Sequence, residues 1–392
     1  MRKVAIIGTG HTDFVFNSPR TEVELFCEAA TEAMEEARVS PQDIQALYCG
    51  NCLGDFSEGQ MMIQSYIAND LGCHHIPATK FEGACSTATM AIRDAFMWVA
   101  SGFYDLVLVG GTEKATAMGS PLATRTFAMG GDGRYEFPAG LTFPGFFALL
   151  AHLYVPQYGI PFEKLREQMS LVSVQSHQYG LKNSHAQIKK EITPDQVKNG
   201  FIVASPLTLY DCCPFSDGAS VLVLASEEMA RQFKKPVWIA GVGQASAPRL
   251  SAQSKFLPRI RSREISVKQA YDMAGVTPQD IDVCELHDCF SIASIIAAES
   301  LGFAEFGTGG ELWEKGETRV GGKIPINISG GLKSKGHPIG ATGASQACEI
   351  TRQLRGELEK EGRQVPGAKV GLVDTLGGDG VICNLVLKAE DD

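Results

Sequence analysis

The sequence Ala-Arg-Val-Ser-Pro-Gln-Asp-Ile at residues 37–44 returns as Ala-Gly-Val-Thr-Pro-Gln-Asp-Ile at residues 274–281. In both places a segment with the apolar spacing of a helix precedes the phrase, and a short apolar run and a second helical segment follow it. A repeat that extends over helix, turn and strand indicates an internally duplicated chain. The alternative is coincidence in a common turn signal, Ser/Thr-Pro-x-Asp, and the matching order of the flanking elements weighs against it.

Strands alternate with helices in each half, which predicts an α/β architecture with mostly parallel sheets. Continuous apolar runs typical of buried strands lie at residues 104–110, 220–225, 370–374 and 381–387. We divide the chain into an N-terminal half at residues 1–117 and 206–232, an inserted region at residues 118–205, and a C-terminal half at residues 233–392. The inserted region is rich in glycine, proline and aromatic residues. We expect it to lie over a functional site or between subunits, although core packing would also explain its aromatic residues.

The bulk composition excludes several classes of protein. The chain has 392 residues, which suits two domains of ordinary size, and its formal charge of −10 argues against nucleic acid as the main partner. No stretch approaches the roughly 20 apolar residues that span a bilayer, and the N-terminal apolar run is too short for a secretory signal. We therefore expect a cytoplasmic protein with no membrane partner. The eleven cysteines are scattered, and the single Cys-x-x-Cys pair has no second pair at zinc spacing, so we expect reduced thiols and no metal site.

Two segments place reactive side chains at glycine-rich turns. Cys85 lies in Gly-Ala-Cys-Ser-Thr at residues 83–87, at the start of a predicted helix, where backbone N–H groups favour the ionised thiol. His337 lies in the glycine-rich segment 329–343, between a predicted strand at residues 324–328 and a predicted helix at residues 341–354. Each has a structural alternative, because most free cysteines are small core residues and a glycine-rich turn can be only a tight connection.

A third segment, Glu-Leu-His-Asp-Cys-Phe at residues 285–290, brings His287 and Cys289 to the end of the strand that follows the repeated turn. His-x-Cys alone is weak evidence, and a metal-ligand pair or a core histidine would explain it equally well.

These three segments together resemble the thiolase superfamily. The motifs are Gly-Ala-Cys-Ser-Thr at 83–87, His-Asp-Cys-Phe at 287–290 and Ser-Gly-Gly-Leu-Lys-Ser-Lys-Gly-His-Pro-Ile-Gly-Ala-Thr-Gly at 329–343, in the family's order and spacing. The His-Asp-Cys-Phe form is similar to the branch of sterol-carrier-protein-type thiolases and archaeal acetyl-CoA acetyltransferases. The resemblance covers the whole chain and implies an α/β fold in which two duplicated βαβαβαββ halves form a five-layered αβαβα sandwich.

The resemblance also implies a reaction, the reversible Claisen condensation or thiolytic cleavage of a 3-ketoacyl-CoA. Cys85 would carry the acyl group, and His337 would accept its proton. The better-known thiolase branch has its second reactive cysteine in a Cys-x-Gly near the C-terminus. This chain has Asp-Thr-Leu-Gly-Gly-Asp-Gly at 374–380 instead, so Cys289 is the implied acid/base. His287 and His337 would stabilise the enolate, and the backbone of Cys85 with the loop of Gly377, Gly378 and Gly380 would form a second oxyanion hole.

Coenzyme A and acyl-CoA are the implied substrates, with no tightly bound cofactor. For the pantetheine arm we expect the backbone of Ser329, Gly330 and Gly331, because glycines permit a narrow channel. The basic segment at residues 249–263 contains Arg249, Lys255 and three further arginines, which could contact the phosphates of coenzyme A or form an ordinary solvated loop.

Two other functions share these features. A decarboxylating ketoacyl synthase of the same fold uses one cysteine and two histidines and would not need Cys289. A non-catalytic lipid-carrying or scaffolding subunit would not need the full reactive set. The resemblance further implies a homodimer or dimer of dimers and a small OB-fold zinc protein as partner, with hydroxymethylglutaryl-CoA synthase in an archaeal assembly. The substrate stays open between acetoacetyl-CoA and a bulkier, aromatic 3-ketoacyl-CoA.

Overall fold

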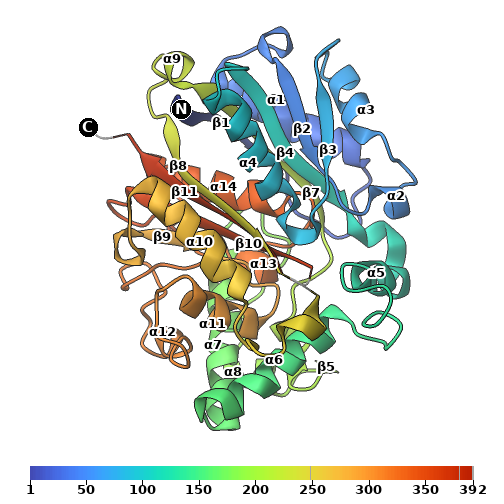
Figure 1. The fold of residues 1–392 in the computed structure, drawn as a ribbon, viewed down its shortest axis with the longest axis vertical. Helices are drawn as coiled ribbons and strands as arrows, with labels where there is room; N and C mark the ends of the chain where they lie inside the picture. The colour runs from blue at the N-terminus through green and yellow to red at the C-terminus, as the bar shows by residue number, and fades with distance from the viewer. Residues whose placement is uncertain (248, 379, 391–392) are drawn as a thin grey trace.

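A nine-stranded sheet organises the computed structural model, which describes residues 1–247, 249–378 and 380–390. Among these residues the strands follow one another across the sheet in the order β3, β2, β4, β7, β1, β8, β11, β10 and β9 (Figure 1). Their bounds in that order are Ala78–Phe81, Ala46–Gly50, Leu106–Lys114, Asp217–Ser226, Val4–His11, Val237–Ser246, Val381–Ala389, Val370–Gly377 and Val283–Glu285.

The sheet has the symmetry of the duplicated sequence. Outward from its centre, the order β1, β7, β4, β2 and β3 on one side matches β8, β11, β10 and β9 on the other, and a bridge from Cys284 to Ile326 stands in the place of the last strand. The repeated turn precedes β2 in one half and β9 in the other. Asp43 accepts hydrogen bonds from the backbone and side chain of Ser40, and Asp280 does the same with Thr277. The predicted duplication is therefore present in the fold.

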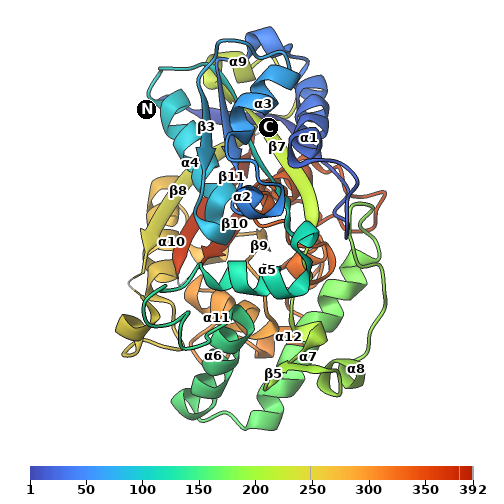
Figure 2. The same cartoon turned by 90° about the vertical axis from the view of Figure 1, so that its right-hand side faces the viewer.

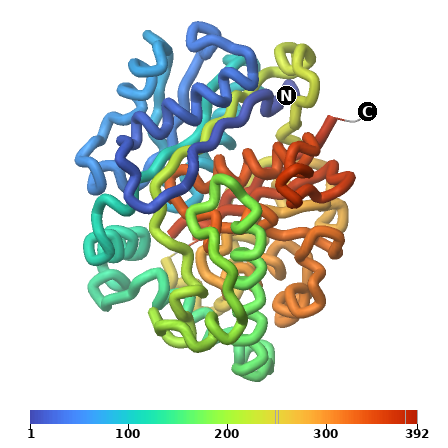
Figure 3. Tube along the Cα trace, turned by 180° about the vertical axis from the view of Figure 1, so that it is seen from behind, coloured from blue at the N-terminus to red at the C-terminus, as the bar shows by residue number. Residues whose placement is uncertain are grey.

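Helices form three further layers. The two half-sheets pair directly at only two positions of β1 and β8, so they separate on either side of that contact. Between them, α4 (Thr87–Ala100) and α14 (Thr342–Arg355) pack on each other and contact strands of both halves. Outside, α1 (Glu22–Ala37), the blue helix of Figure 3, covers β1 and β7, while α10 (Arg261–Ala274) covers β8 and β11. This is the expected five-layered αβαβα sandwich.

Burial on both faces explains why the strands are continuous apolar runs. Side chains alternate across a strand, so Val4 and Ile6 of β1 belong to the core around α4 and α14, whereas Ala5 and Ile7 belong to the core beneath α1. A strand covered on both sides has no solvent face that would need polar residues.

The direction of the strands differs from the prediction of mostly parallel sheets. The pairs β2–β3, β2–β4 and β9–β10 are parallel, but β4–β7, β1–β7, β1–β8, β8–β11 and β10–β11 are antiparallel. A helical crossover is needed only between parallel neighbours. The long inserted segment that joins β4 to β7 and the short connection between β10 and β11 both let the chain reverse.

The predicted strand at residues 324–328 is also wrong, because it is reduced to the single bridge at Ile326. Pro325 has no N–H to offer a neighbouring strand, and Asn327 has a positive φ of 53°, which ends the extended conformation. The short helix α13 (Gly331–Ser334) then intervenes, so His337 lies between two helices instead of at a strand-to-helix junction.

Most of the remaining elements lie at the lower end of the molecule, and four short helices lie higher (Figure 2). At the lower end are α6 (Phe143–Tyr158), α7 (Phe162–Gly180), α8 (Pro194–Lys198), α11 (Ser291–Ser300), α12 (Glu311–Glu314), β5 (Ile202–Ala204) and β6 (Leu207–Thr208). Above them in this view lie α5 (Gly119–Ala128) and α2 (Gly54–Ser57), and α3 (Ile63–Asp70) and α9 (Glu227–Ala230) lie near the upper end. Among the described residues, no helix is both long enough and apolar enough to cross a membrane.

Candidate active site

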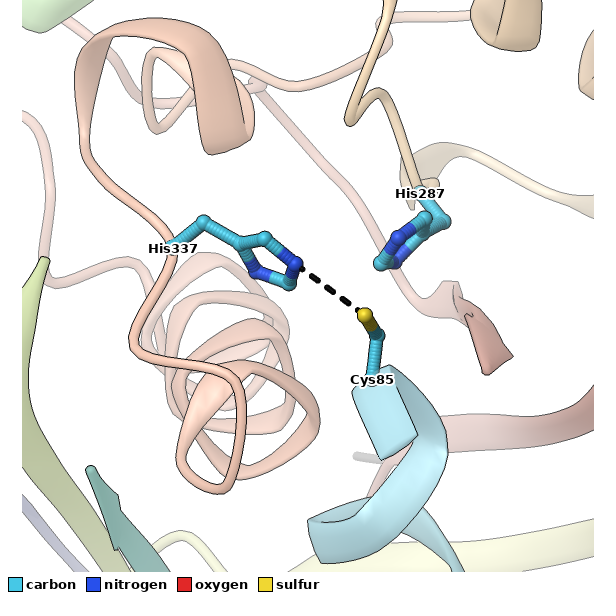
Figure 4. Close-up of side chains that lie close together, drawn as sticks. All are labelled: Cys85, His287 and His337. Carbon is cyan, nitrogen blue, oxygen red and sulfur yellow. Dashed lines mark hydrogen bonds between the residues drawn. The ribbon is translucent and has the colours of Figure 1, made fainter. Parts of the chain in front are cut away.

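Cys85, His287 and His337 converge from three distant segments (Figure 4). The Nε2 atom of His337 lies 3.3 Å from the Sγ atom of Cys85, and the centroids of the two imidazole rings are 5.2 Å apart. The sulfur and one nitrogen of each ring all lie within 4.8 Å of one another. A thiol and two imidazoles therefore face a common point.

Local hydrogen bonds hold Cys85 in a 3-10 turn just before α4. Ala84 has a positive φ of 48°, an unusual conformation for alanine that turns the chain sharply before the cysteine. The Thr87 hydroxyl accepts from the N–H of Gly83 and donates to the carbonyl of Ala84, and Glu82 accepts from the N–H of Ala84. The turn fixes the direction of the Cys85 side chain.

Burial outweighs the helix start in setting the charge of Cys85. The sequence predicted a thiol that ionises readily, but burial raises the pKa of Cys85 well above its ordinary value, and the neighbouring Cys213 and Glu113 add to the rise. The backbone contribution acts in the expected direction and is smaller. Burial also lowers the pKa of His337 to about 4. The resting pair is a neutral thiol beside a neutral imidazole.

A hydrogen bond on the far side of the ring sets the tautomer of His337. Its Nδ1 atom lies 2.6 Å from the hydroxyl of Thr342, and that hydroxyl donates to the carbonyl of Pro338 at 2.9 Å. Because a hydroxyl has one proton to donate, Nδ1–H must be the donor to Thr342. The lone pair of Nε2 then points at the thiol of Cys85, as a general base requires.

His287 is fully buried, and neither of its ring nitrogens has a hydrogen-bond partner among the described residues. Burial lowers the pKa of His287 well below its ordinary value, and His337, Arg263 and Lys333 lower it further, so the ring is neutral. Its backbone N–H donates to Asp374, which is paired with the buried Arg263 at 3.0 Å. An unpaired buried ring nitrogen is costly, and a ligand atom in the cavity would satisfy it.

Cys289 lines the same cavity and is 7% exposed. The N–H of Cys213 donates to the carbonyl of Cys289 at 2.9 Å. The preceding Asp288 is held by a buried ion pair with Lys333 and by the N–H of Leu332. Burial raises the pKa of Cys289 well above its ordinary value, with Cys213 and Cys85 as further causes, so Cys289 is a protonated thiol.

These groups line a cavity of about 360 Å³ whose wall is mostly apolar. Its aromatic lining comes from Phe127, Phe143, Phe147, Phe215 and Phe290. Phe147 stacks on Phe290 with ring centroids 4.7 Å apart. The cavity combines an apolar wall with a small convergent set of polar groups, which is the usual form of a small-molecule site.

Comparison with known proteins agrees with this geometry. The family model of the thiolase N-terminal domain matches residues 4–228, and that of the thiolase C-terminal domain matches residues 243–384. The chain belongs to the thiolase family.

Similar proteins extend over nearly the whole chain. The acetyl-CoA acetyltransferase of Methanothermobacter thermautotrophicus is 41% identical and covers 97% of each chain. Benzoylsuccinyl-CoA thiolase subunit BbsB of Thauera aromatica is 34% identical over 96% of this chain and 95% of its own. Sterol carrier protein 2 of Oryctolagus cuniculus is 33% identical over 96% of this chain and 70% of its own. Among solved structures, the Ltp2-ChsH2(DUF35) aldolase has a TM-score of 0.82 at 26% identity, covering 99% of this chain and 98% of that one.

In this thiolase the loop after β10 lies against the turn that carries Cys85. A Cβ atom at Gly377 would come within 2.1 Å of the carbonyl oxygen of Gly83, so only glycine allows this approach. Gly378 lines the cavity. Gly380 instead holds the loop in place: its N–H donates to the carbonyl of Gly377, and its own carbonyl accepts from Ser262.

The residues expected to hold the pantetheine arm of coenzyme A do not line this cavity. Ser329, Gly330 and Gly331 are buried and do not line the cavity. The Ser329 hydroxyl donates to Glu285, and a Cβ atom at Gly330 would come within 2.8 Å of the backbone of Gly180 on α7. Close packing of the chain accounts for this glycine pair, which sequence reasoning had assigned to a ligand channel.

The basic segment is mostly committed to ion pairs. Arg259 and Arg261 both pair with Glu264, and Arg263 is buried against Asp374. Arg249 lies 3.5 Å from Asp132 and over the ring of Tyr135. Lys255 is exposed. The cluster in the sequence therefore does not form one cationic surface.

Sequence reasoning missed three residues that shape the site. Thr342 was quoted within the glycine-rich motif but given no role. Cys213 also lines the cavity and adds to the raised pKa of both Cys85 and Cys289. The carboxylate of Glu113 accepts from the N–H groups of Cys52, Leu53 and Gly340, which ties the loop after His337 to the other half of the chain. The only sign of Glu113 in the sequence was its position as an acidic residue at the end of the apolar run of β4.

Proposed function

We propose that this thiolase transfers acyl groups between coenzyme A thioesters through an acyl thioester on Cys85. The observation that supports this most directly is the 3.3 Å contact from Nε2 of His337 to Sγ of Cys85, in the tautomer that accepts a proton. His337 takes the proton as the sulfur attacks the thioester carbonyl. The thiol therefore need not be ionised at rest, because deprotonation and attack occur together.

Cys289 acts as the acid/base of the reaction. In cleavage its thiol gives a proton to the leaving enolate and recovers one from the incoming coenzyme A thiol. In the synthetic direction it first protonates the departing coenzyme A thiolate, and the resulting Cys289 thiolate then removes a proton from the second acyl group. His337 holds the proton of Cys85 until that sulfur is released. The unpaired ring nitrogens of His287 support a role as hydrogen-bond donor to the enolate oxygen, with His337 beside it. We assign the second oxyanion hole to the backbone N–H of Cys85 and to Gly378, and we give Gly377 and Gly380 the task of shaping that loop.

The inserted region supplies part of the cavity wall that would contact the acyl group. Thr124, Phe127, Phe143 and Phe147 all lie within residues 118–205 and line the cavity. We propose that this region, between the two parts of the N-terminal half, distinguishes acyl groups. Its apolar wall accepts acetoacetyl-CoA and also bulkier acyl chains, in keeping with relatives named as an acetyl-CoA acetyltransferase and a benzoylsuccinyl-CoA thiolase subunit. Arg249 and Lys255 stay our proposal for the coenzyme A phosphates.

We further propose a small DUF35-type partner, because a thiolase-fold relative has a structure described as a complex of this kind. A homodimer and an association with hydroxymethylglutaryl-CoA synthase remain proposals from the resemblance. A cytoplasmic location is consistent with eleven free cysteines, which a reducing compartment preserves.

Acyl trapping tests the proposed reaction. Incubation with acetyl-CoA should add one acetyl group to the chain by intact mass, and peptide mapping should place it on Cys85. The Cys85→Ser variant should gain no acetyl group. Absence of the adduct in the wild-type protein, alone and with a DUF35-type partner, would favour the non-catalytic scaffold.

A second variant separates the thiolase from a decarboxylating synthase. Cys289→Ala should still form acetyl-Cys85, because Cys85 and its base His337 are unchanged and solvent can protonate the departing coenzyme A thiolate, but it should lose condensation and cleavage of acetoacetyl-CoA. Full activity of Cys289→Ala with a malonyl thioester would support the decarboxylating alternative.

A further inference from the structure

The convergence of one thiol and two imidazoles is also the ligand set of a zinc site. Zn²⁺ binds cysteine sulfur at about 2.3 Å and histidine nitrogen at about 2.0–2.1 Å in tetrahedral geometry. Tetrahedral ligands at those bond lengths are separated by roughly 3.4 Å between two nitrogens and roughly 3.6 Å between nitrogen and sulfur. The Cys85–His337 pair, at 3.3 Å, is within a few tenths of an ångström of the nitrogen–sulfur spacing.

The third ligand is close to its required position. The relevant nitrogen of His287 lies within 4.8 Å of both other ligand atoms, so a side-chain rotation that closes the gap by roughly 1 Å completes the triangle. His287 is fully buried and makes no ring hydrogen bond with any described residue. Nothing within the described chain competes for its nitrogens, and no existing ring contact must be broken when it binds an ion.

The surroundings complete the requirements of a metal site. The Nδ1–H of His337 is held by Thr342, which orients Nε2 as the ligating nitrogen, as outer hydrogen bonds do at metal sites. The cavity of about 360 Å³ offers an entry path and room for a water molecule at the fourth position. Thiolate with imidazole is a ligand set that suits Zn²⁺.

We propose that Cys85, His287 and His337 form an inhibitory site for Zn²⁺, with a water molecule as the fourth ligand. On binding, the Cys85 thiol releases its proton to solvent and forms a sulfur–zinc bond, so one proton leaves for each ion bound. The metal coordinates the Cys85 sulfur, which would carry the acyl group, and the two imidazoles that would act as base and as hydrogen-bond donor in acyl transfer. Binding is independent of the proposed acyl transfer, whereas the inhibition rests on it.

Acylation and zinc binding exclude each other at this site. A thioester sulfur is a poor ligand because the thiolate is the species that binds metal. Acetylation of Cys85 by acetyl-CoA should therefore prevent Zn²⁺ from binding, and bound Zn²⁺ should prevent alkylation of Cys85. The site would make the activity respond to free zinc and to the supply of acyl-CoA.

Cobalt titration tests the proposal. Metal-free protein should bind one Co²⁺ per chain and show a thiolate-to-cobalt charge-transfer band together with the visible bands of a tetrahedral ion, and Zn²⁺ should displace it one for one. Cys85→Ser should abolish the charge-transfer band, and His287→Asn and His337→Asn should each weaken binding by about 100-fold or more. Wild-type protein alkylated at Cys85, with its fold checked by circular dichroism, should also lack the band.

His74 and His75 provide the control. They are adjacent and exposed, with ring centroids 6.4 Å apart, and they lie outside the site. The double variant His74→Ala/His75→Ala should bind Co²⁺ as the wild type does. A charge-transfer band that survives in Cys85→Ser, or the lack of any such band in wild-type protein, would overturn the zinc site. If cobalt binds as expected but acetyl-CoA never labels Cys85, the proposed acyl transfer fails and the metal site stands.

Discussion

At the scale of single residues, the site depends on which nitrogen of His337 carries the proton. Thr342 decides this, because its hydroxyl accepts a hydrogen bond from Nδ1–H and donates one to the carbonyl of Pro338. A base that faces a protonated thiol must present a lone pair, so the hydroxyl acts on Cys85 through the ring.

Replacement of Thr342 by valine should slow acylation of Cys85 by on the order of tenfold to a hundredfold, since the tautomer and ring orientation lose their support. Thr342→Ser keeps the hydroxyl and should retain most of the rate. Rapid quenching with acetyl-CoA followed by intact mass measures the rate directly. Equal rates in Thr342→Val and wild type, with unchanged thermal stability, would contradict the assignment.

The charge state of Cys85 predicts an unusual pH dependence. Alkylation needs the thiolate, whose fraction rises tenfold per pH unit below the pKa. Because burial raises the pKa of Cys85 and lowers that of His337 to about 4, iodoacetamide labelling should rise steadily from about pH 6 to about pH 9, without a plateau near neutrality and without an inflection at the ordinary histidine pKa. Mass mapping of Cys85 across this range checks the slope. A plateau near neutral pH would instead indicate an ion pair at rest.

At the scale of elements, His287 is positioned by a buried ion pair that joins α10 to β10. Arg263 on α10 pairs with Asp374 on β10, and Asp374 also accepts from Asn384 on β11 and from the N–H of His287. Both charged side chains have no solvent exposure. The pair therefore links an outer layer of the sandwich to the cavity.

Asp374→Leu should destabilise the protein by about 3–5 kcal/mol, because it leaves Arg263 as an uncompensated buried charge. The double variant Arg263→Met/Asp374→Leu should recover most of this loss, since neutral side chains need no partner. Urea unfolding measures both. Activity should stay low in the double variant, because the acceptor for the His287 N–H is still missing. Full activity in the double variant would mean that the Arg263–Asp374 pair contributes only to stability and does not position His287.

At the scale of the whole molecule, the duplication and the three reactive segments could be predicted because each depends on local residue order, whereas the five layers were implied by the family resemblance. It could not predict features decided by contacts between distant segments. The glycines at 330 and 331 were interpreted as a ligand channel, but they allow close packing on α7 and beside Asp288. Cys85 was expected to ionise because its helix start is visible in the sequence. The burial that outweighs this effect depends on residues from both halves of the fold, which line the cavity together.

The two halves of the thiolase also meet at the contact between the central helices. Gly343 at the start of α14 faces Thr89 on α4, and a Cβ atom there would lie 1.9 Å from Oγ1 and 2.7 Å from the backbone nitrogen of Thr89. Thr89 cannot turn away freely, because its hydroxyl accepts from Thr375 on β10. An added methyl group must therefore push α4 and α14 apart.

Gly343→Ala should lower the free energy of unfolding by about 1–3 kcal/mol, despite the better helix propensity of alanine. Acyl transfer should fall as well, since α4 follows Cys85 and α14 follows His337, and the two side chains separate with their helices. Gly133→Ala is the matched control, because a Cβ atom at Gly133 meets no atom within 4 Å. Urea unfolding and the rate of acetyl-Cys85 formation measure both effects. An unchanged unfolding midpoint in Gly343→Ala would mean that the central helices tolerate the added methyl group. The close contact between α4 and α14 would then not explain how Cys85 is held beside His337.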